Sequence, residues 1–260
     1  MNKLEYEMIE VLSELKEKYG LFEIKAEYEN EGSRDVELMR LKDVADKLNL
    51  PMIIKIGGVE AITDMYNCLG LGVKGIIAPM AETGFAASKF LNAIEKFVPE
   101  DNRKDIEFAI NIETITAYNN LDDILNLNNI SLLKSITVGR VDFCESLGKE
   151  RDYANGKEMM NYCRDIFSKV KNKNLKGALG GAISTESVAF LKELISEKLI
   201  NKYETRKLVY KSETAKDIFD GINLGVKFEL LWLKSKRRYY HRIKDEDDKR
   251  IQMLEKRLNS

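Results

Sequence analysis

The sequence predicts an α/β protein built on a parallel β-sheet, and two observations lead to this class. Short runs rich in β-branched residues alternate with longer stretches of helical periodicity from Leu21 to about residue 210. This alternation is typical of βαβ units, whose crossover helices make neighbouring strands parallel. The chain has 260 residues, 44% hydrophobic and 33% charged, which suits one or two domains with an ordinary core.

The elements follow in a regular order. Residues 1–20 predict an amphipathic helix ended by Gly20, because acids and lysines recur at helical spacing; no apolar stretch there is long enough for a signal peptide or a spanning helix. The predicted strands are 21–28, 52–58, 73–79, 105–113, 133–142, 175–181 and 202–210. The predicted helices between them are 35–49, 60–70, 83–98, 116–127, 156–172 and 185–198.

The pattern leaves two parallel architectures open, an open doubly wound sheet and a closed barrel. A barrel needs eight strands, one more than the pattern supplies, whereas its usual length of about 250 residues matches this chain. A missing strand would be an irregular segment near the N-terminus or lie within about the last 45 residues. The stretch GLGVKG, residues 70–75, matches G-x-G-x-x-G but follows a helix and opens a strand, so we expect Gly70 or Gly72 to cap that helix instead.

Composition narrows the classes of partner and compartment. The formal net charge of −1 lacks the broad basic footprint of a nucleic-acid binder. The three cysteines, Cys68, Cys144 and Cys163, are an odd number without C-x-x-C spacing, so neither a disulfide framework nor a zinc site is predicted. We therefore expect a protein of the reducing cytoplasm with no membrane partner.

Charged and glycine residues gather at the predicted carboxyl ends of the strands, where parallel α/β folds bind their ligands. Taken one at a time, each of these residues would also fit an ordinary solvent-exposed loop. Their repetition favours a site, and Arg140 with Asp142, like Glu204 with Arg206, forms an i, i+2 pair expected to share a strand face. Glu113 and Asp142, with waters, would suit Mg²⁺ or Mn²⁺ rather than zinc. The residues at these ends are Lys25, Glu27, Lys55, Glu82, Glu113, Arg140, Asp142, Gly180, Gly181, Glu204 and Arg206.

Residues 211–260 predict a helical extension of two helices, 215–240 and 245–258. Residues 234–260 hold ten Lys or Arg against five Asp or Glu, which would suit an anionic surface. The apolar run FELLWL, however, favours a helix that packs on another subunit, so we expect a homo-oligomer rather than a nucleic-acid complex. His241, in this extension, is interpreted as a surface residue.

Three stretches carry a family resemblance: GVKGIIAPMAET, FAINIETITAYNNLDDIL and ITVGRVDFCESLG. In order and spacing they resemble strand ends of the HpcH/HpaI aldolase and citrate lyase β-subunit family, within the phosphoenolpyruvate/pyruvate barrel superfamily. The similarity covers roughly residues 21–210. The shorter motifs KAEYENEG, KIGGVEA, INIETIT, GRVD and YETRK resemble a branch described only as aldolase/citrate lyase family proteins.

The resemblance implies a (β/α)8 TIM-type barrel over residues 21–210, irregular in one strand, often with C-terminal helices exchanged between subunits. It implies metal ligands at Glu113 and Asp142. It also implies a carbon–carbon bond made or broken next to a 2-oxo acid or an acyl thioester, because a divalent ion on the keto oxygen stabilises an enolate. Lys25, Glu82, Gly180, Gly181 and Arg206 would then contact the substrate.

The sequence also departs from the family. Lys55 stands where many members have an Arg, so Arg140 or Arg206 would supply the bidentate carboxylate contact. Many aldolases of the family use a histidine near the first strand, but here the single histidine is His241. We expect Glu27 as the acid/base group, with a pKa raised by burial, Lys25 beside it, and Glu29 or Glu31 as alternatives.

The catalytic set expected is thus Glu27, Lys55 and Arg140, in a metal-dependent carbon–carbon lyase. Two readings stay open beside it. Lys25, Glu27 and Arg206 would instead form an ion network that closes the barrel, and the protein would then be a catalytically degenerate barrel that binds a carboxylate ligand in a regulatory role. In the second alternative, the protein is a lyase subunit that works only within a larger complex.

Overall fold

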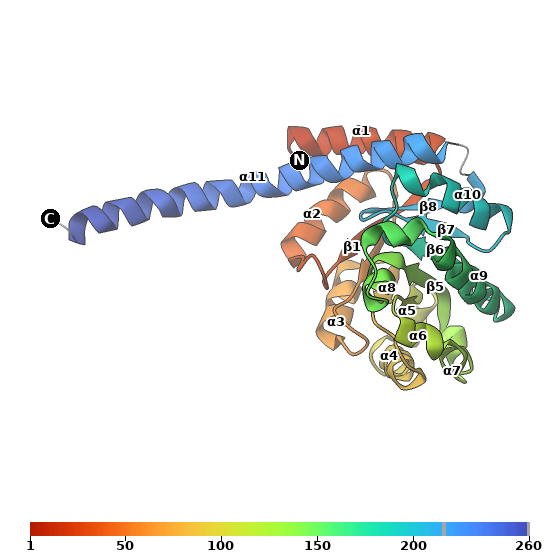
Figure 1. The fold of residues 1–260 in the computed structure, drawn as a ribbon. Coiled ribbons are helices and arrows are strands. Elements are labelled where there is room, and N and C mark those ends of the chain that lie inside the picture. Colours follow the sequence, from red (N-terminus) through yellow and green to blue (C-terminus); the bar gives the residue numbers. More distant parts are fainter. Residues whose placement is uncertain (215–216, 259–260) are drawn as a thin grey trace.

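A computed structural model describes residues 1–214 and 217–258, and within these residues eight strands close into a barrel in the order β1 to β8 (Figure 1). The strands are β1 (Leu21–Glu27), β2 (Met52–Lys55), β3 (Gly75–Ala78), β4 (Glu107–Ile112), β5 (Leu133–Gly139), β6 (Lys176–Gly180), β7 (Lys202–Glu204) and β8 (Leu208–Lys211). The predicted α/β class and barrel are confirmed, including one irregular strand.

The irregular strand is β8, which runs antiparallel to both of its neighbours, β7 and β1. Residues 205–207 turn the chain back, and the backbone N–H of Thr205 donates to the carbonyl of Leu208 at 2.9 Å. The prediction of a single strand over 202–210 is therefore wrong, as are both predicted locations of the eighth strand. The turn falls in a short polar run, residues 205–207, and no Gly, Pro or Asn marks it.

Helices surround the barrel. They are α1 (Lys3–Lys18), α2 (Asp35–Asp46), α3 (Ile62–Leu71), α4 (Gly84–Phe97), α5 (Glu100–Arg103), α6 (Ile115–Asn119), α7 (Leu121–Leu125), α8 (Arg140–Ser146), α9 (Lys157–Asn172), α10 (Val188–Ser196) and α11 (Ile218–Leu258), with short 3₁₀ turns η1 (Ile130–Leu132), η2 (Arg151–Asn155), η3 (Thr185–Ser187) and η4 (Ser212–Thr214). Gly72, in the left-handed conformation (φ 67°), caps α3, which confirms the expected helix end in GLGVKG.

One predicted boundary matters for the site. The sequence predicts a strand through Asp142, but β5 ends at Gly139 and α8 begins at Arg140. Asp142 thus stands in the first turn of a helix, where the unpaired N–H groups favour a negative charge. Arg140 and Asp142 do not share a strand face, and that expectation is wrong.

The barrel wall separates two environments. Ile24 and Ala26 of β1 belong to the apolar core between the strands and the helices. Inside the barrel the apolar cluster is small, formed by Ile53, Ile77, Ala109 and Val209, with Phe22 packed against it. Because successive side chains of a strand point to opposite faces, the charged residues Lys25 and Glu27 face the interior. The barrel therefore has a polar centre above a thin apolar layer.

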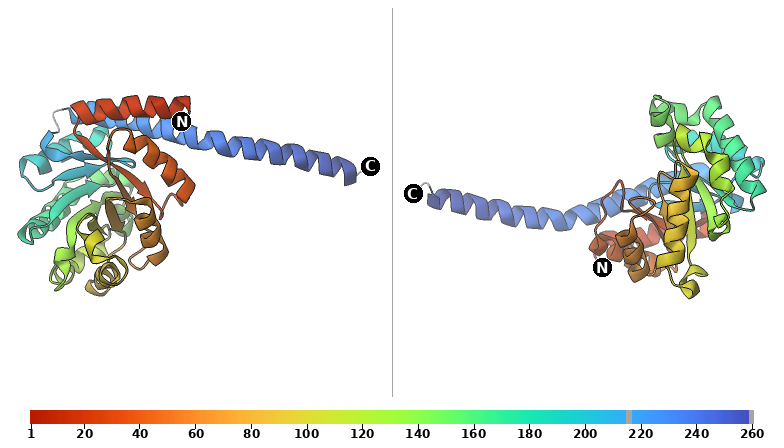
Figure 2. Two further views of the ribbon diagram at one scale, coloured as in Figure 1. Left: turned by 180° about the vertical axis from the view of Figure 1, so that it is seen from behind. Right: turned by 90° about the horizontal axis from the view of Figure 1, so that it is seen from below.

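Helix α11 lies beside α1 and then extends well past the barrel (Figures 1 and 2). Its first half is anchored by buried apolar residues that include Phe228, Leu231 and Trp232. Asn2, which caps α1, donates from Nδ2 to Ser235 Oγ at 3.0 Å. The expectation of two helices is wrong: Ile218–Leu258 is one continuous helix. Residues 215 and 216, where the predicted helix begins, lie outside the described residues, as do 259 and 260.

No helix in the described part of the chain has both the length and the apolar composition that crossing a membrane requires.

Candidate active site

A cavity of about 470 Å³ opens at the carboxyl ends of the strands. Most strands bring a residue to it at or just past their last position, which is where parallel barrels collect functional groups. Nine of the sequence-predicted residues line it: Lys25, Glu27, Lys55, Glu113, Asp142, Gly180, Gly181, Glu204 and Arg206. The structure therefore brings together residues at or just past the ends of β1, β2, β4, β6 and β7 and one residue of α8, although they are distant along the chain.

Glu113 is the most buried carboxylate of the predicted set, with 1% of its surface exposed. It accepts hydrogen bonds from the Met80 backbone N–H and from Asn111 Nδ2, both at 3.0 Å. Burial raises its pKa to about 7; Lys55 and these two donors oppose the rise and Asp142 adds to it. The nearby positive charge therefore does not fully balance the buried Glu113 carboxylate.

The surroundings of Glu113 and Asp142 fit a hard cation. Glu113 and Asp142 both line the cavity, and two carboxylates with open positions are the donor set that Mg²⁺ accepts in partnership with water or substrate oxygens. Gly139 leaves the carboxylate room, because a Cβ there would lie 2.5 Å from Glu113 Oε2. Across residues 1–214 and 217–258, no three His, Cys, Asp or Glu residues come together as a metal cluster, so a bound ion would need ligands besides these residue types.

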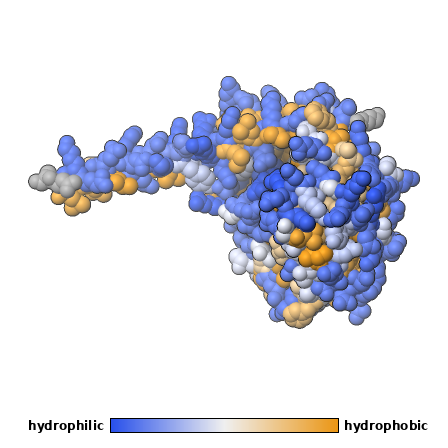
Figure 3. Space-filling view, in the orientation of Figure 1, coloured by the Kyte–Doolittle hydropathy of each residue, from blue (hydrophilic) through white to orange (hydrophobic). Residues whose placement is uncertain are grey.

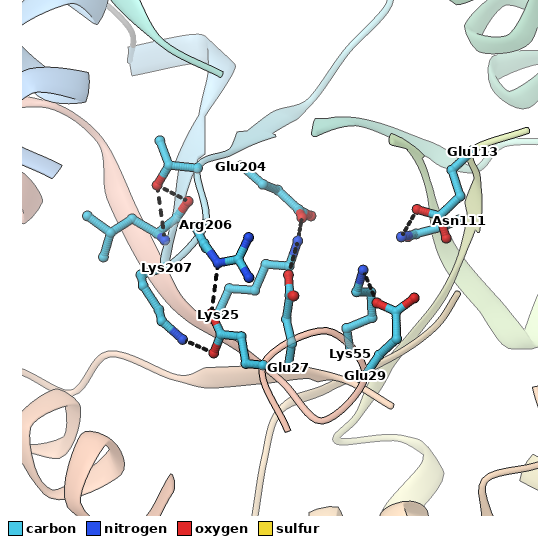
Figure 4. A network of polar contacts seen from close by, with 12 residues as sticks. Lys25, Glu27, Glu29, Lys55, Asn111, Glu113, Glu204, Arg206 and Lys207 are labelled. Carbon is cyan, nitrogen blue, oxygen red and sulfur yellow. Dashed lines mark hydrogen bonds and ion pairs between the residues drawn. The ribbon is translucent and has the colours of Figure 1, made fainter. Parts of the chain in front are cut away.

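Lys25 stands between two carboxylates (Figure 4). Its Nζ lies 2.8 Å from Glu204 Oε2 and 3.6 Å from Glu27 Oε1. Burial disfavours the ammonium ion, but Glu204 and Glu27 outweigh it and raise the pKa of Lys25 well above its usual value. Lys25 is therefore a fixed positive charge in the centre of the site.

The pKa of Glu27 is lowered, which contradicts the expected rise. Burial works to raise it, but the cations Lys25, Lys55 and Arg206 together outweigh burial. The expectation counted burial and neighbouring acids along the chain, whereas the fold surrounds Glu27 with cations from other strands. Glu27 is consequently held as a carboxylate at neutral pH.

The acidic run that follows β1 is paired residue by residue (Figure 4). Lys55 Nζ lies 2.5 Å from Glu29 Oε2. Glu31 accepts from Arg206 Nε at 3.1 Å and also from Lys207. An ion network is thus present at the barrel mouth, in addition to the cavity, but its membership differs from the expected one: Lys25 contacts Glu27, whereas Arg206 pairs with Glu31. Arg206 keeps 45% of its side chain exposed, so its other nitrogens face the opening.

Arg140 lies outside the cavity lining, contrary to the expected role beside Asp142. Its guanidinium is fully buried and donates to protein oxygens: the Ala154 carbonyl and Asn155 Oδ1 at 2.9 Å, and the Gly181 carbonyl at 2.8 Å. It also lies over the ring of Phe190, 4.7 Å from the centroid. As the first residue of a helix rather than the last of a strand, its side chain is turned toward α10 and ties loops together.

Glu82 also lies away from the cavity. Thr114 Oγ1 donates to Glu82 Oε1 at 2.7 Å, and Asn120 Nδ2 donates to its carbonyl at 3.0 Å. Glu82 therefore joins the loops that follow β3 and β4.

Sequence reasoning did not single out several other lining residues. Asn111 and Thr137 stand two positions before Glu113 and Gly139, on inward positions of otherwise apolar strands, and that alternation could have revealed them. Arg151 and Glu229 come from η2 and α11, and no local signal places them at the barrel mouth.

Fold and site together describe an α/β barrel with a cavity lined by both acidic and basic residues at the carboxyl ends of its strands, an arrangement typical of barrel enzymes. The model of the HpcH/HpaI aldolase/citrate lyase family matches residues 43–186. The chain belongs to this family, which confirms the resemblance and supports a lyase of the aldolase/citrate lyase type.

Solved structures agree in fold. The HpcH/HpaI aldolase from Desulfitobacterium hafniense DCB-2 superposes with a TM-score of 0.60 at 14% identity, covering 76% of this chain and 81% of that one. The citrate synthase SbnG gives 0.57 at 16% identity, covering 72% and 78%. A family protein from Burkholderia cenocepacia J2315 gives 0.53 at 11%, covering 71% and 88%. No curated protein matches the sequence. At these identities the likeness is one of fold.

Proposed function

We propose that the protein is a divalent-metal-dependent carbon–carbon lyase acting on a 2-oxo acid or an acyl thioester through an enolate. The observation that carries this proposal is the pair Glu113 and Asp142 at the barrel mouth. A carboxyl group whose pKa is about 7 because it is buried near another acid gains most from a cation. Family membership supports the reaction class.

Glu113 and Asp142 would hold Mg²⁺ or Mn²⁺, and either ion would supply Lewis-acid stabilisation of negative charge on the substrate oxygen. Lys55 and the exposed end of Arg206 would bind the substrate carboxylate. Arg206 takes this role in place of Arg140, whose donors already serve protein carbonyls. Gly180 would leave room for the substrate at the wall formed by β6, whereas Gly181 allows the backbone to approach Arg140, because a Cβ there would lie 2.5 Å from Arg140 N.

Glu27 is the group in this site that would accept a proton from a substrate hydroxyl. It lines the cavity and is ionised at neutral pH, so it can act as a base without prior deprotonation. Its lowered pKa makes it a weak base, and Lys25 at 3.6 Å stabilises the charged form further. We therefore propose it as the proton acceptor for cleavage, with modest driving force.

One observation favours the alternative of a barrel that binds a carboxylate ligand without turnover. The single histidine, His241, stands on α11 in contact with Arg237, and the acid that would replace a catalytic histidine has a lowered pKa. Both features weaken proton transfer while leaving the cation and carboxylate contacts in place.

Two measurements separate these functions. Calorimetric titration of the protein with Mg²⁺ and oxalate, which mimics the pyruvate enolate, tests the binding site. An assay for pyruvate release from a panel of 4-hydroxy-2-oxo acids tests turnover. Binding with turnover supports the lyase, and binding without turnover supports the alternative. Failure to bind oxalate with Mg²⁺ would contradict both.

We also propose that residues 211–260 form an oligomerisation segment of a cytoplasmic enzyme. Beyond the barrel, Figure 3 shows apolar surface gathered toward one side of the projecting part of α11. The exposed apolar residues of this part of the helix include Ile243, Ile251 and Leu254. An apolar side on a helix that extends from its own barrel needs a partner. The three cysteines are buried and unpaired, as expected in a reducing compartment. Light scattering should give a mass above 29.8 kDa that falls to this value when Ile251 and Leu254 become Glu.

A further inference from the structure

The floor of the cavity carries polar groups without protein partners. Glu204, Asn111 and Thr137 all line the cavity, and they are exposed by only 2%, 4% and 2%. Among the described residues, no hydrogen bond reaches Asn111 Oδ1, Thr137 Oγ1 or either carboxylate oxygen of Glu204. Glu204 Oε2 has Lys25 as an ion-pair partner, which leaves the carboxylate without a hydrogen-bond donor. Leaving a buried polar group unpaired is costly, so these atoms indicate a missing hydrogen-bonding partner.

These groups belong to one place in the barrel. Asn111 and Thr137 are directly paired across β4 and β5. On the next strand, Gly180 leaves space above Thr137, because a Cβ there would lie 3.5 Å from Thr137 Cγ2 and 3.9 Å from Glu204 Oε2. One small chemical group entering beside Gly180 would therefore be near both Thr137 and Glu204.

The surrounding charges decide what kind of group fits. Two of the three are pure acceptors, the Asn111 carbonyl oxygen and the Glu204 carboxylate, so the ligand must donate. An ammonium group would donate, but it would meet Lys25 and Lys55, which are both held in their charged forms. A neutral hydroxyl donates to the acceptors without that repulsion. It can also pair with Thr137 as donor or acceptor.

We propose that Asn111, Thr137 and Glu204 form a hydroxyl-recognition subsite, which takes the hydroxyl groups of a small hydroxylated carbon chain. This subsite deepens the proposed function. It rests on that function in one respect: the hydroxylated carbon chain is taken to be the part of the substrate that is joined to the 2-oxo acid. Lys55 and Arg206 hold the carboxylate at the mouth, and the hydroxylated chain extends inward past Gly180. The subsite thus selects polyhydroxylated over plain aliphatic partners.

The test compares two ligands that differ only in hydroxyl groups, 3,4-dihydroxybutanoate and butanoate, by calorimetry in EDTA. Without metal, chelation cannot contribute. We expect the dihydroxy acid to bind about 10-fold tighter in the wild type, as two modest hydrogen bonds would produce. The preference should fall about fivefold in Thr137→Val, which keeps the shape and removes the hydroxyl. It should also fall in Gly180→Ala, whose methyl group fills the entry to the subsite.

Controls keep the outcome decisive. Thr116→Val is the same substitution at an exposed position of α6 and should leave the preference unchanged. Thr137→Val should melt at or above the wild-type temperature, because it removes a buried hydroxyl that lacks a partner. A melting temperature lower by several degrees, equal affinity for the two acids, or no binding of either at millimolar concentration would each overturn the proposal. Ordered water that fills the floor without any ligand preference would overturn it as well.

The subsite and the proposed function can fail separately. If Mg²⁺ and oxalate bind but the two acids do not differ, the subsite is wrong and the metal site stands. If the acids differ but oxalate does not bind with Mg²⁺, the subsite stands and the lyase proposal falls.

Discussion

Lys25 and Glu204 form an ion pair inside the barrel, with 2.8 Å between Nζ and Oε2 and side chains only 10% and 0% exposed. They belong to β1 and β7, the two strands that flank the reversed strand β8. The pair thus connects the barrel across its one irregular position. Because two charges buried together depend on each other, removing one should cost far more than breaking a surface pair.

We expect Glu204→Gln to lower the free energy of unfolding by about 3 kcal/mol, because it leaves the Lys25 ammonium with only the more distant Glu27. The double variant with Lys25→Met should recover part of this loss. Urea unfolding of both variants measures the effect. Lys42→Met, which breaks the half-exposed pair with Asp46, is the matched control and should change stability by less than about 1 kcal/mol. Equal losses of unfolding free energy in Glu204→Gln and Lys42→Met would show that the buried ion pair stabilises the fold no more than the half-exposed pair does.

Divalent-ion binding should require Glu113 and Asp142. Glu113→Gln or Asp142→Asn should abolish Mg²⁺ binding in calorimetry, while the melting temperature of the metal-free protein stays the same or rises, since one of two neighbouring acids is removed. Glu145→Gln, an exposed position of α8, should bind as the wild type does. Wild-type affinity in either site variant would remove the metal hypothesis, and a large loss of stability would mean that these acids are structural.

Stability should depend on pH through Glu23, which is not a candidate ligand. Burial raises its pKa from 4.5 to about 7, with Lys202 opposing and Glu107 adding to the rise. The folded protein therefore holds this proton up to a higher pH than the unfolded chain does. As pH rises from about 4.5 to 7, the contribution of Glu23 to the free energy of unfolding should fall, by up to about 3 kcal/mol.

The measurement is urea unfolding at several pH values between 4.5 and 8. In Glu23→Gln this part of the pH dependence should disappear, whereas Glu10→Gln, at an exposed position of α1, should retain it. Identical pH profiles for Glu23→Gln and the wild type would contradict the shifted pKa.

Glu27→Gln should lower kcat/KM for pyruvate release by about 10²-fold or more if Glu27 is the proton acceptor. Because the pKa of Glu27 is lowered, its ionisation should appear in the pH profile below its usual value of 4.5, rather than above it as burial alone would suggest. Mg²⁺ binding should survive the substitution. A variant with wild-type rate and pH profile would assign Glu27 to the ion network alone.

Arg140→Lys distinguishes a loop-tying role from a substrate contact. A lysine cannot reach the Ala154 and Gly181 carbonyls together, so the free energy of unfolding should fall by about 2 kcal/mol or more. The affinity for oxalate with Mg²⁺ should change much less than in Arg206→Lys. Unchanged stability with a large loss of oxalate affinity would restore Arg140 as a substrate ligand.

Local sequence determined much of the fold. Alternating strand and helix patterns were enough to predict an α/β fold with a parallel sheet, because hydrophobic periodicity reports directly on which face of an element is buried, and the family resemblance added the closed barrel. Charged residues after apolar runs were enough to predict most of the charged residues that line the cavity, including Glu113, Asp142 and Lys55. In a parallel barrel the strand ends converge on one face, so position along the strand also predicts position in space.

Tertiary structure alone decided the rest. The reversal of β8 depends on its pairing with both β7 and β1, and no Gly, Pro or Asn before it marks the turn. The direction of Arg140 depends on α8 beginning one residue after Gly139. The lowered pKa of Glu27 depends on Lys55 and Arg206, which are distant in sequence. Pairing, side-chain direction and electrostatic balance are sums over groups that only the folded chain brings together, and for this reason the local pattern could not predict them.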